Sequence, residues 1–200
     1  MANITGVVNY GVAGNIHSIK KAIEAAGGTV RVIDSANEFE RVDRVVIPGV
    51  GSFKDAMTEL TNVGYIEAIN KTLVEKPVLG ICLGMQILAT LGFEYGKRKG
   101  LGAIQAEVKP IQVNAVVPHM GFNKLDVVVP NSILSGIENE EFYFMHSFEM
   151  VNYTDVAALT DYAGHRFVSA VRRGNVHGVQ FHPEKSRDAG IRLFSNFLAL

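Results

Sequence analysis

The sequence contains a single cysteine among 200 residues and has no long hydrophobic run. One cysteine cannot form an internal disulfide, so we expect the chain to work in a reducing compartment, the cytoplasm. No apolar stretch approaches the roughly 20 residues that a membrane-spanning helix requires. The N-terminal segment also lacks the basic region and the apolar stretch of a signal peptide. These absences favour a cytoplasmic protein that does not enter a membrane.

The sequence also lacks an excess of either charge, because 19 Lys and Arg stand against 20 Asp and Glu. This balance gives no electrostatic reason to expect binding to nucleic acid or to a membrane surface. The cysteine and the six histidines show no metal-ligand spacing, and the glycine-rich loops do not follow G-x-G-x-x-G. We therefore expect no metal and no cofactor. The remaining composition, 48% hydrophobic and 20% charged, is ordinary for a globular chain with a full core.

The first half of the chain alternates strand-like and helix-like patterns. β-branched and other apolar runs predict strands at residues 4–8, 29–34, 42–47 and 78–82. Apolar residues at helical spacing predict helices over residues 16–26, 53–60, 66–74 and 84–91. Asn15 and Ser52 precede the first two helices as candidate N-caps. Such alternation predicts a parallel, doubly wound sheet with helices on both faces.

The second half is richer in strands. Strand-like segments occupy residues 108–113, 125–129, 141–150, 157–159, 167–172 and 176–181, and a helix over residues 188–198 closes the chain. We expect His17 in a helix, His177 in a strand and His165 in a loop. Since no linker or repeat interrupts the pattern, residues 1–200 are predicted to form one α/β domain. Its sheet is mostly parallel, doubly wound and flanked by helices, with an extra strand-rich section in the second half.

The single cysteine, Cys82, lies between a predicted strand and a predicted helix, with Gly80 and Gly84 on either side. This pattern has the shape of the nucleophile elbow G-x-S-x-G, with cysteine in place of serine. A sharp strand-to-helix turn leaves no room for side chains beside the nucleophile, which accounts for the glycines. The alternative is a buried structural cysteine. The two glycines favour a nucleophile, because they otherwise weaken both elements.

His182 follows the buried strand that ends at Phe181, and Glu184 stands two residues later. Extended chain sends residues i and i+2 to the same side, and the intervening proline stiffens the link. The carboxyl ends of parallel strands gather at one edge of a sheet, which brings His182 toward Cys82. A cysteine nucleophile needs a base and the base an orienting acceptor. The sequence therefore predicts a Cys82–His182–Glu184 triad, the alternative being a surface turn.

Acyl transfer through a tetrahedral intermediate also needs hydrogen-bond donors for its oxyanion. The backbone N–H of Leu83, directly after the nucleophile, is one candidate. A second can come from the loop that follows the strand at residues 42–47, which contains Gly49, Val50 and Gly51. Its glycines let the backbone approach a ligand closely. The alternative is a plain strand-to-helix connection.

The segments Gly80-Ile-Cys-Leu-Gly-Met-Gln86 and Gln180-Phe-His-Pro-Glu184 together resemble the motifs of triad-type (class I) glutamine amidotransferases. Further segments are similar to the glutaminase subunits of imidazole glycerol phosphate synthase, an enzyme of histidine biosynthesis. They lie at residues 9–15, 48–53, 119–123, 142–147 and 182–186 and extend over nearly the whole chain. The resemblance implies the α/β fold of that class, with L-glutamine as substrate.

The resemblance also implies a role for each site residue. Cys82 would attack the side-chain amide of glutamine, His182 would handle the protons, and Glu184 would hold and polarise the imidazole. Gly51 and Gln86 would contact the glutamine. Hydrolysis would release ammonia for a second protein.

That second protein would be a (β/α)8-barrel cyclase subunit, which uses the ammonia to make imidazole glycerol phosphate and a carboxamide ribonucleotide. Phe122, Tyr143 and Lys185 match positions that the family uses at or near the subunit interface. The peptide between Gly49 and Val50 would have to turn its N–H inward to complete the oxyanion hole. That turn would explain a low basal activity and its rise when the partner binds.

Two departures from the family pattern support an alternative. Phe122 stands where the family usually has tryptophan, and the loop at residues 10–15 is one residue longer than usual. Paralogous glutaminases supply ammonia to aminosugar synthases for surface polysaccharide, and this chain could be one of them. A third hypothesis, a catalytically silent binding subunit, conflicts with the complete set of motif residues. A cysteine peptidase usually has histidine directly after the cysteine, where this chain has Leu83.

Overall fold

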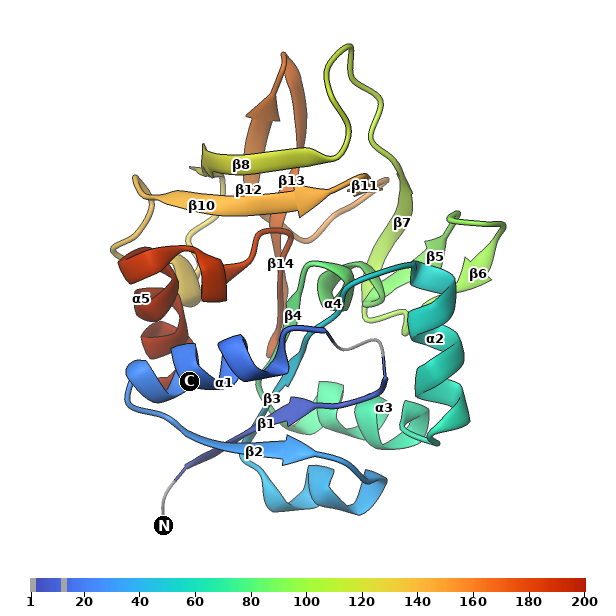
Figure 1. Cartoon of the computed structure of the whole chain (residues 1–200), viewed down its shortest axis with the longest axis vertical. Coiled ribbons are helices and arrows are strands. Elements are labelled where there is room, and N and C mark those ends of the chain that lie inside the picture. Colours follow the sequence, from blue (N-terminus) through green and yellow to red (C-terminus); the bar gives the residue numbers. More distant parts are fainter. Residues whose placement is uncertain (1–2, 12–13) are drawn as a thin grey trace.

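The structure is a computed structural model that describes residues 3–11 and 14–200, arranged around one large mixed sheet (Figure 1). The strand order of this sheet is β2-β1-β3-β4-β14-β13-β12-β9. Strands β2, β1, β3, β4 and β14 pair in parallel, whereas β13, β12 and β9 continue the sheet in antiparallel pairs. The parallel strands are β1 (Ile4–Val8), β2 (Thr29–Ile33), β3 (Arg44–Ile47), β4 (Val78–Ile81) and β14 (Val176–Val179). The antiparallel strands are β9 (Asp126–Val127), β12 (Val156–Tyr162) and β13 (His165–Arg173).

Two smaller sheets complete the strand content. A four-stranded sheet contains β5 (Ala89–Gly92), β6 (Arg98–Lys99), β7 (Ile104–Pro110) and β11 (Phe148–Val151). A two-stranded antiparallel ribbon consists of β8 (His119–Lys124) and β10 (Glu141–His146). In Figure 1 this ribbon lies across the upper part of the molecule, above α4 and α5.

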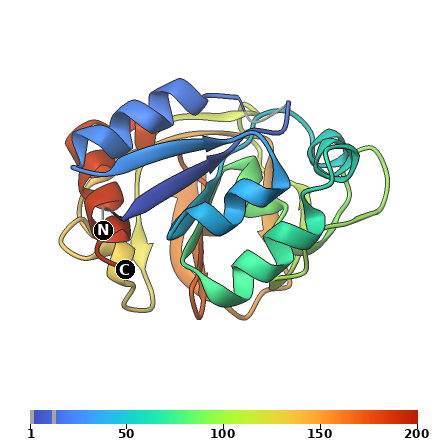
Figure 2. The ribbon, with the colours of Figure 1, turned by 90° about the horizontal axis from the view of Figure 1, so that it is seen from below.

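The helices cover both faces of the large sheet. They are α1 (Ile16–Ala25), α2 (Phe53–Asn62), α3 (Ile66–Glu75), α4 (Leu83–Gln86) and α5 (Arg187–Leu198), with 3-10 turns η1 (Ala36–Arg41), η2 (Ser132–Leu134) and η3 (Pro183–Lys185). Figure 2 shows α1 and α5 together on one side and α2 and α3 on the other. Alternate side chains of β1 serve the two faces: Val7 packs in the core with α1 and α5, and Val8 in the core with α2 and α3. The predicted fold class is confirmed.

Several predicted elements are confirmed closely. The strand at residues 4–8 is β1, His17 lies in α1 and His177 lies in β14. Ser52 is the N-cap of α2, because its side chain accepts a hydrogen bond from the Asp55 N–H at 3.1 Å. Residues 12 and 13 of the predicted N-terminal loop lie outside the described residues. No helix in the described part of the chain combines the length and the apolar character that crossing a membrane requires.

Other predictions are wrong. The helix predicted over residues 84–91 ends at Gln86, and the strand β5 begins at Ala89. Every residue from 81 to 89 is buried, so no polar face marks where the helix stops. The strand predicted over residues 141–150 is two strands that meet at Ser147. His165 begins β13 instead of lying in a loop.

Candidate active site

Cys82 lies at the sharp turn between β4 and α4 with a backbone φ of 54°. A non-glycine residue rarely adopts a positive φ, and such strain costs about 1–3 kcal/mol. The flanking glycines are required sterically. A Cβ at Gly84 would lie 1.8 Å from the carbonyl oxygen of Ile47, and a Cβ at Gly80 would lie 2.6 Å from that of Gly84. The predicted elbow is therefore present, with β3 packed directly against it.

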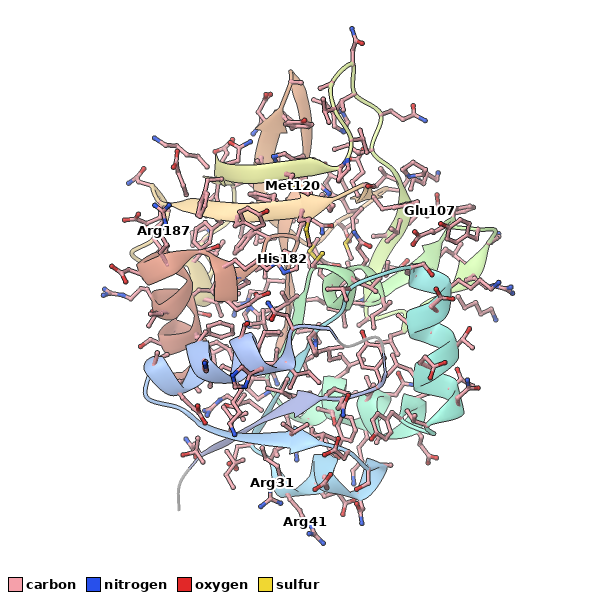
Figure 3. All side chains as sticks on the ribbon, viewed as in Figure 1. Arg31, Arg41, Glu107, Met120, His182 and Arg187 are labelled. Atoms are coloured by element: carbon pink, nitrogen blue, oxygen red, sulfur yellow. The ribbon has the colours of Figure 1, made fainter. Side chains whose placement is uncertain are left out.

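His182 follows β14 and is held by Glu184. Its Nδ1 lies 2.9 Å from Glu184 Oε1, and both side chains are buried. Since a carboxylate accepts hydrogen bonds, Nδ1–H donates and Nε2 is turned the other way. Nε2 meets no partner at standard hydrogen-bond geometry within the described residues. Figure 3 places His182 near the centre of the molecule, below β10.

The protonation of His182 reflects opposing effects. Burial lowers its pKa, but the nearby Cys82 and Glu184, which favour the charged imidazolium, outweigh burial and raise the pKa to about 10. Asn15 also donates to Glu184 Oε1, at 3.2 Å. Asn15 occupies the predicted N-cap position of α1, but its side chain makes no capping hydrogen bond to that helix. The geometry stabilises an imidazolium beside Cys82.

A cavity of about 400 Å³ opens in front of Cys82 and His182. The candidate oxyanion and substrate residues Val50, Gly51, Leu83 and Gln86 also line this cavity. Its remaining walls consist of Glu94, Tyr95, Pro118 and residues 145–148. The structure thus gathers six separate stretches of the chain around this cavity. Such a cavity is large enough for an amino acid.

Gly49 lies behind the cavity, packed against the elbow. A Cβ on Gly49 would lie 2.7 Å from the hydroxyl oxygen of Tyr10 and 3.1 Å from the Gly84 nitrogen. Tyr10 is buried and donates to the Pro48 carbonyl oxygen at 2.6 Å. Gly51 has a φ of +94°, which glycine adopts at little cost. The loop that carries the candidate oxyanion donors is therefore held close to Leu83.

Gln86 is fixed by its own amide group. Its Nε2 donates to the Phe148 carbonyl oxygen at 3.1 Å and to Gln180 Oε1 at 2.9 Å. Both amide hydrogens are then used, so Oε1 alone remains to face a ligand, as an acceptor. Gln180 is fully buried and its Nε2 lies 3.5 Å from Cys82 Sγ. Gln180 thus donates a hydrogen bond to the candidate nucleophile, a contact that sequence reasoning missed.

Known proteins are similar to nearly the whole chain. Residues 7–200 match the family Glutamine amidotransferase class-I. The chain belongs to this family. It is 38% identical to the imidazole glycerol phosphate synthase subunit HisH 1 of Campylobacter jejuni (strain RM1221), over 94% of this chain and 96% of that protein. It is 41% identical to the subunit HisH of Desulfitobacterium hafniense (strain DSM 10664 / DCB-2), over 96% of this chain and 92% of that protein.

Solved structures share the fold of this glutamine amidotransferase. The structure of PurLQS from Thermotoga maritima matches with a TM-score of 0.80 at 19% identity, covering 100% of this chain and 99% of that one. A crystal structure titled glutamine amidotransferase matches with a TM-score of 0.77 at 20% identity, covering 98% and 99%. At these identities the likeness concerns the fold alone.

Glu94 is a residue of this amidotransferase that sequence reasoning missed. It lines the cavity, and its Oε2 accepts a hydrogen bond from the Phe53 N–H at 2.7 Å. Burial raises the pKa of Glu94, and the Phe53 hydrogen bond opposes that shift in part. Glu94 follows β5, and the four-stranded sheet places it at the cavity. No sequence motif surrounds Glu94, so the sequence alone did not indicate this position. Within residues 3–11 and 14–200, no group of three or more potential ligands is arranged to hold a metal ion.

The three candidate interface residues of the amidotransferase lie together. The rings of Phe122 and Tyr143 meet edge to face with centroids 5.5 Å apart, and Lys185 Nζ lies 5.5 Å from the Tyr143 centroid. Arg187, which was not predicted, stacks on Phe122 at 4.7 Å. Figure 3 shows Arg187 beside the end of the β8–β10 ribbon. Phe122 is 40% exposed, so this cluster presents an aromatic and cationic surface to solvent.

Proposed function

We propose that this chain is the glutaminase subunit of an imidazole glycerol phosphate synthase, and that it hydrolyses L-glutamine and passes the ammonia to a cyclase subunit. The Cys82–His182–Glu184 arrangement at the mouth of an amino-acid-sized cavity is the observation that carries the chemistry. The similarity to synthase subunits over nearly the whole chain supports the assignment to histidine biosynthesis. The single free cysteine fits the reducing conditions of the cytoplasm.

The reaction begins with His182 as an imidazolium, whose Nε2 already carries a proton, and the negatively charged sulfur of Cys82 attacks the side-chain carbonyl carbon of glutamine. The carbonyl oxygen becomes an oxyanion, which accepts hydrogen bonds from the N–H of Leu83 and, once the peptide between Gly49 and Val50 has turned its N–H inward, from the N–H of Val50. Leu83 is the first residue of α4, and the first N–H groups of a helix have no partner within it. His182 then gives its proton to the departing nitrogen, which leaves as ammonia.

The second half of the reaction removes the acyl group from Cys82. Ammonia departure leaves a thioester between the sulfur and the glutamyl group. His182 takes a proton from a water molecule, which attacks the thioester. The sulfur then leaves as an anion as the glutamate product forms, and His182 keeps the proton, which restores the imidazolium of the starting state. Glu184 keeps the imidazole oriented through both steps and stabilises its charged form.

Two acceptors in the cavity fit the α-ammonium group of free glutamine. Gln86 offers only its Oε1, because both hydrogens of its amide are used by Phe148 and Gln180. Glu94 lines the same cavity with a carboxylate. An ammonium group donates three hydrogen bonds and carries a positive charge, which these two groups match. This chemistry favours a free amino acid over a glutamine residue within a peptide.

The cyclase subunit would bind over the surface that Phe122, Tyr143, Lys185 and Arg187 form. These residues lie on the β8–β10 ribbon and on the segment directly after His182. The backbone N–H of His182 donates to the Tyr143 carbonyl oxygen at 2.8 Å. A partner that shifts the ribbon would therefore act on the backbone of the catalytic histidine. This connection supports activation by the partner.

The test is glutamate release by the chain alone and after mixing with the cyclase subunit of the same organism and its nucleotide ligand. We expect the rate to rise at least about tenfold on mixing and to vanish in Cys82→Ala. No rise, together with labelling of Cys82 by a reactive glutamine analogue, would keep the glutaminase and assign its ammonia to another synthase. An aminosugar synthase is then the partner to test.

A further inference from the structure

Two buried histidines outside the triad form a pair beside the cavity. His119 begins β8 and His146 ends β10, and the two residues face each other in the register of the ribbon. Nδ1 of His119 lies 3.1 Å from Nε2 of His146. Both side chains are buried, and His146 lines the cavity next to Cys82. The proposed reaction uses neither imidazole.

The contacts fix which nitrogen carries each proton. Nδ1 of His146 lies 2.9 Å from the Phe148 carbonyl oxygen, which can only accept, so this nitrogen carries a hydrogen. Burial lowers the pKa of both imidazoles, that of His146 to about 4, so both rings are neutral near pH 7. Nε2 of a neutral His146 is then an acceptor, and Nδ1–H of His119 donates to it. The pair therefore has one direction, from His119 toward Phe148.

The hydrogen bonds continue from Phe148 to the nucleophile. The Phe148 carbonyl oxygen accepts from His146 Nδ1 and from Gln86 Nε2, which occupies both of its lone pairs. Gln86 Nε2 also donates to Gln180 Oε1, and Gln180 Nε2 donates to Cys82 Sγ. A continuous buried chain thus runs from His119 on the ribbon to the sulfur of Cys82. Its members are held in fixed positions because each donor meets a defined acceptor.

His119 is also clamped by aromatic rings at the ribbon. Its imidazole stacks on Tyr162 with centroids 4.1 Å apart and on Phe144 at 5.0 Å. The next residue, Met120, is 57% exposed on the outer side of β8 (Figure 3). Alternate residues of this strand therefore face the buried chain and the solvent. A movement of β8 would be transmitted to His146 through the hydrogen bond from His119 Nδ1, which is 3.1 Å long.

We propose that His119 and His146 are positioning residues for glutamine, which act by fixing the Phe148 carbonyl oxygen and, through it, Gln86. The hydrogen bond between the two histidines fixes the position of the cavity wall at residues 145–148 relative to strand β8 of the ribbon. This inference rests on the proposed function, since it assumes that glutamine occupies the cavity. It assigns the two histidines to substrate binding and leaves bond making and bond breaking to the triad.

The first test uses two substitutions at His146 that each keep one half of its hydrogen bonding. Asparagine places an amide nitrogen, a donor, near the position of Nδ1. Glutamine places an amide oxygen near that of Nε2, where it can accept from His119 Nδ1–H. His146→Asn keeps the donor to Phe148, whereas His146→Gln loses it. We expect His146→Gln to raise KM for glutamine about tenfold with kcat little changed, and His146→Asn to raise it clearly less. Equal KM values for the two variants would overturn the proposal.

A second pair of substitutions covers the case in which His146 variants fold poorly. His119→Asn keeps a donor for His146 Nε2, and His119→Leu removes it with similar volume. We expect KM to rise several-fold in His119→Leu and to stay near the wild-type value in His119→Asn. His177→Leu replaces a buried histidine of β14 that does not line the cavity, and it controls for general destabilisation. A KM increase of the same size in His177→Leu would contradict a positioning role.

Calorimetric titration of glutamine into each variant, made in a Cys82→Ala background, measures the affinity of the cavity for glutamine without turnover. The same ranking of affinities is expected there. A wild-type complex that does not hydrolyse glutamine would overturn the proposed function. A wild-type complex that does hydrolyse it, with all four variants matching its KM and affinity, would overturn this inference alone.

Discussion

The parallel and antiparallel parts of the molecule contribute different things to one site. Cys82 and His182 both follow parallel strands, β4 and β14, which are neighbours in the large sheet. The opposite cavity wall, residues 145–148, joins β10 to β11, two strands of the smaller antiparallel pairings. The parallel part therefore holds the proposed reacting groups, and the antiparallel part holds the proposed substrate wall and the exposed cluster at Phe122. In such an arrangement, substitutions in one part can change substrate binding or partner binding without changing the reacting groups in the other part.

The two parts also differ in whether backbone contacts or side-chain contacts hold the site residues in place. Around Cys82, the backbone N–H donates to Val179 at 2.8 Å, and close packing excludes any side chain at Gly80 and Gly84. The wall at residues 145–148 is instead held by side chains, through His146 and Gln86. Substitutions in the parallel part should thus abolish the reaction, and substitutions in the antiparallel part should alter KM, partner affinity or activation.

The largest expected effect follows removal of the nucleophile. Cys82→Ala should lower glutaminase activity of the activated complex by about 10⁴-fold or more, because no other group in the cavity can form the acyl intermediate. The cavity wall is untouched, so glutamine should still bind, which calorimetry can measure. Activity within tenfold of the wild type would show that Cys82, and with it the parallel part, does not supply the nucleophile.

A smaller effect is expected from the group behind the histidine. Glu184→Gln keeps an acceptor for His182 Nδ1 but removes the charge that helps to raise the His182 pKa to about 10. We expect kcat to fall about 10³-fold and the His182 pKa to move down toward its ordinary value. The imidazolium would then be lost at lower pH, which NMR titration of the His182 ring can follow. An unchanged titration would show that Glu184 does not control this charge.

The antiparallel part is tested at its exposed surface. Phe122→Ala should weaken binding of the cyclase subunit about tenfold, because it removes an aromatic group that also orients Arg187. Val128→Ala is the matched control, since Val128 is 45% exposed and belongs neither to the β8–β10 ribbon nor to the segment after His182. Surface plasmon resonance gives both affinities. Equal losses in the two variants would argue against a defined docking surface.

The smallest effect concerns stability and acid. Burial and the charge of Arg172 lower the pKa of His177 from 6.5 to about 4. Between those values the unfolded chain binds a proton that the folded chain does not, so stability falls as the pH drops from about 6.5 to about 4. In His177→Leu this fall should be smaller by a few degrees in Tm. Parallel Tm-against-pH curves for the two proteins would contradict the assignment.

The candidate triad residues could be located from the sequence because each of them belongs to a short local pattern. Cys82 is marked by its glycines, and His182 and Glu184 by their place after a buried strand. The same local reasoning confirmed β1 and the Ser52 cap. Local patterns specify the conformation of a short segment and the contacts between residues that are close in sequence.

The opposite wall could not be predicted, since it depends on pairings between distant segments. Glu94 reaches the cavity only because β5 pairs with β7, and His119 meets His146 only through the register of the ribbon. The helix predicted over residues 84–91 was wrong for a related reason, because complete burial leaves no periodic signal. Residues that line a binding cavity from several distant segments have no recognisable motif in any one of those segments.

The most direct test of the account is mass spectrometry of the chain after reaction with a glutamine analogue that traps the nucleophile. The account predicts one adduct, on Cys82, formed faster in the presence of the cyclase subunit and slowed by free glutamine. No adduct on Cys82 in the presence of that partner, or an adduct whose formation glutamine does not slow, would contradict it.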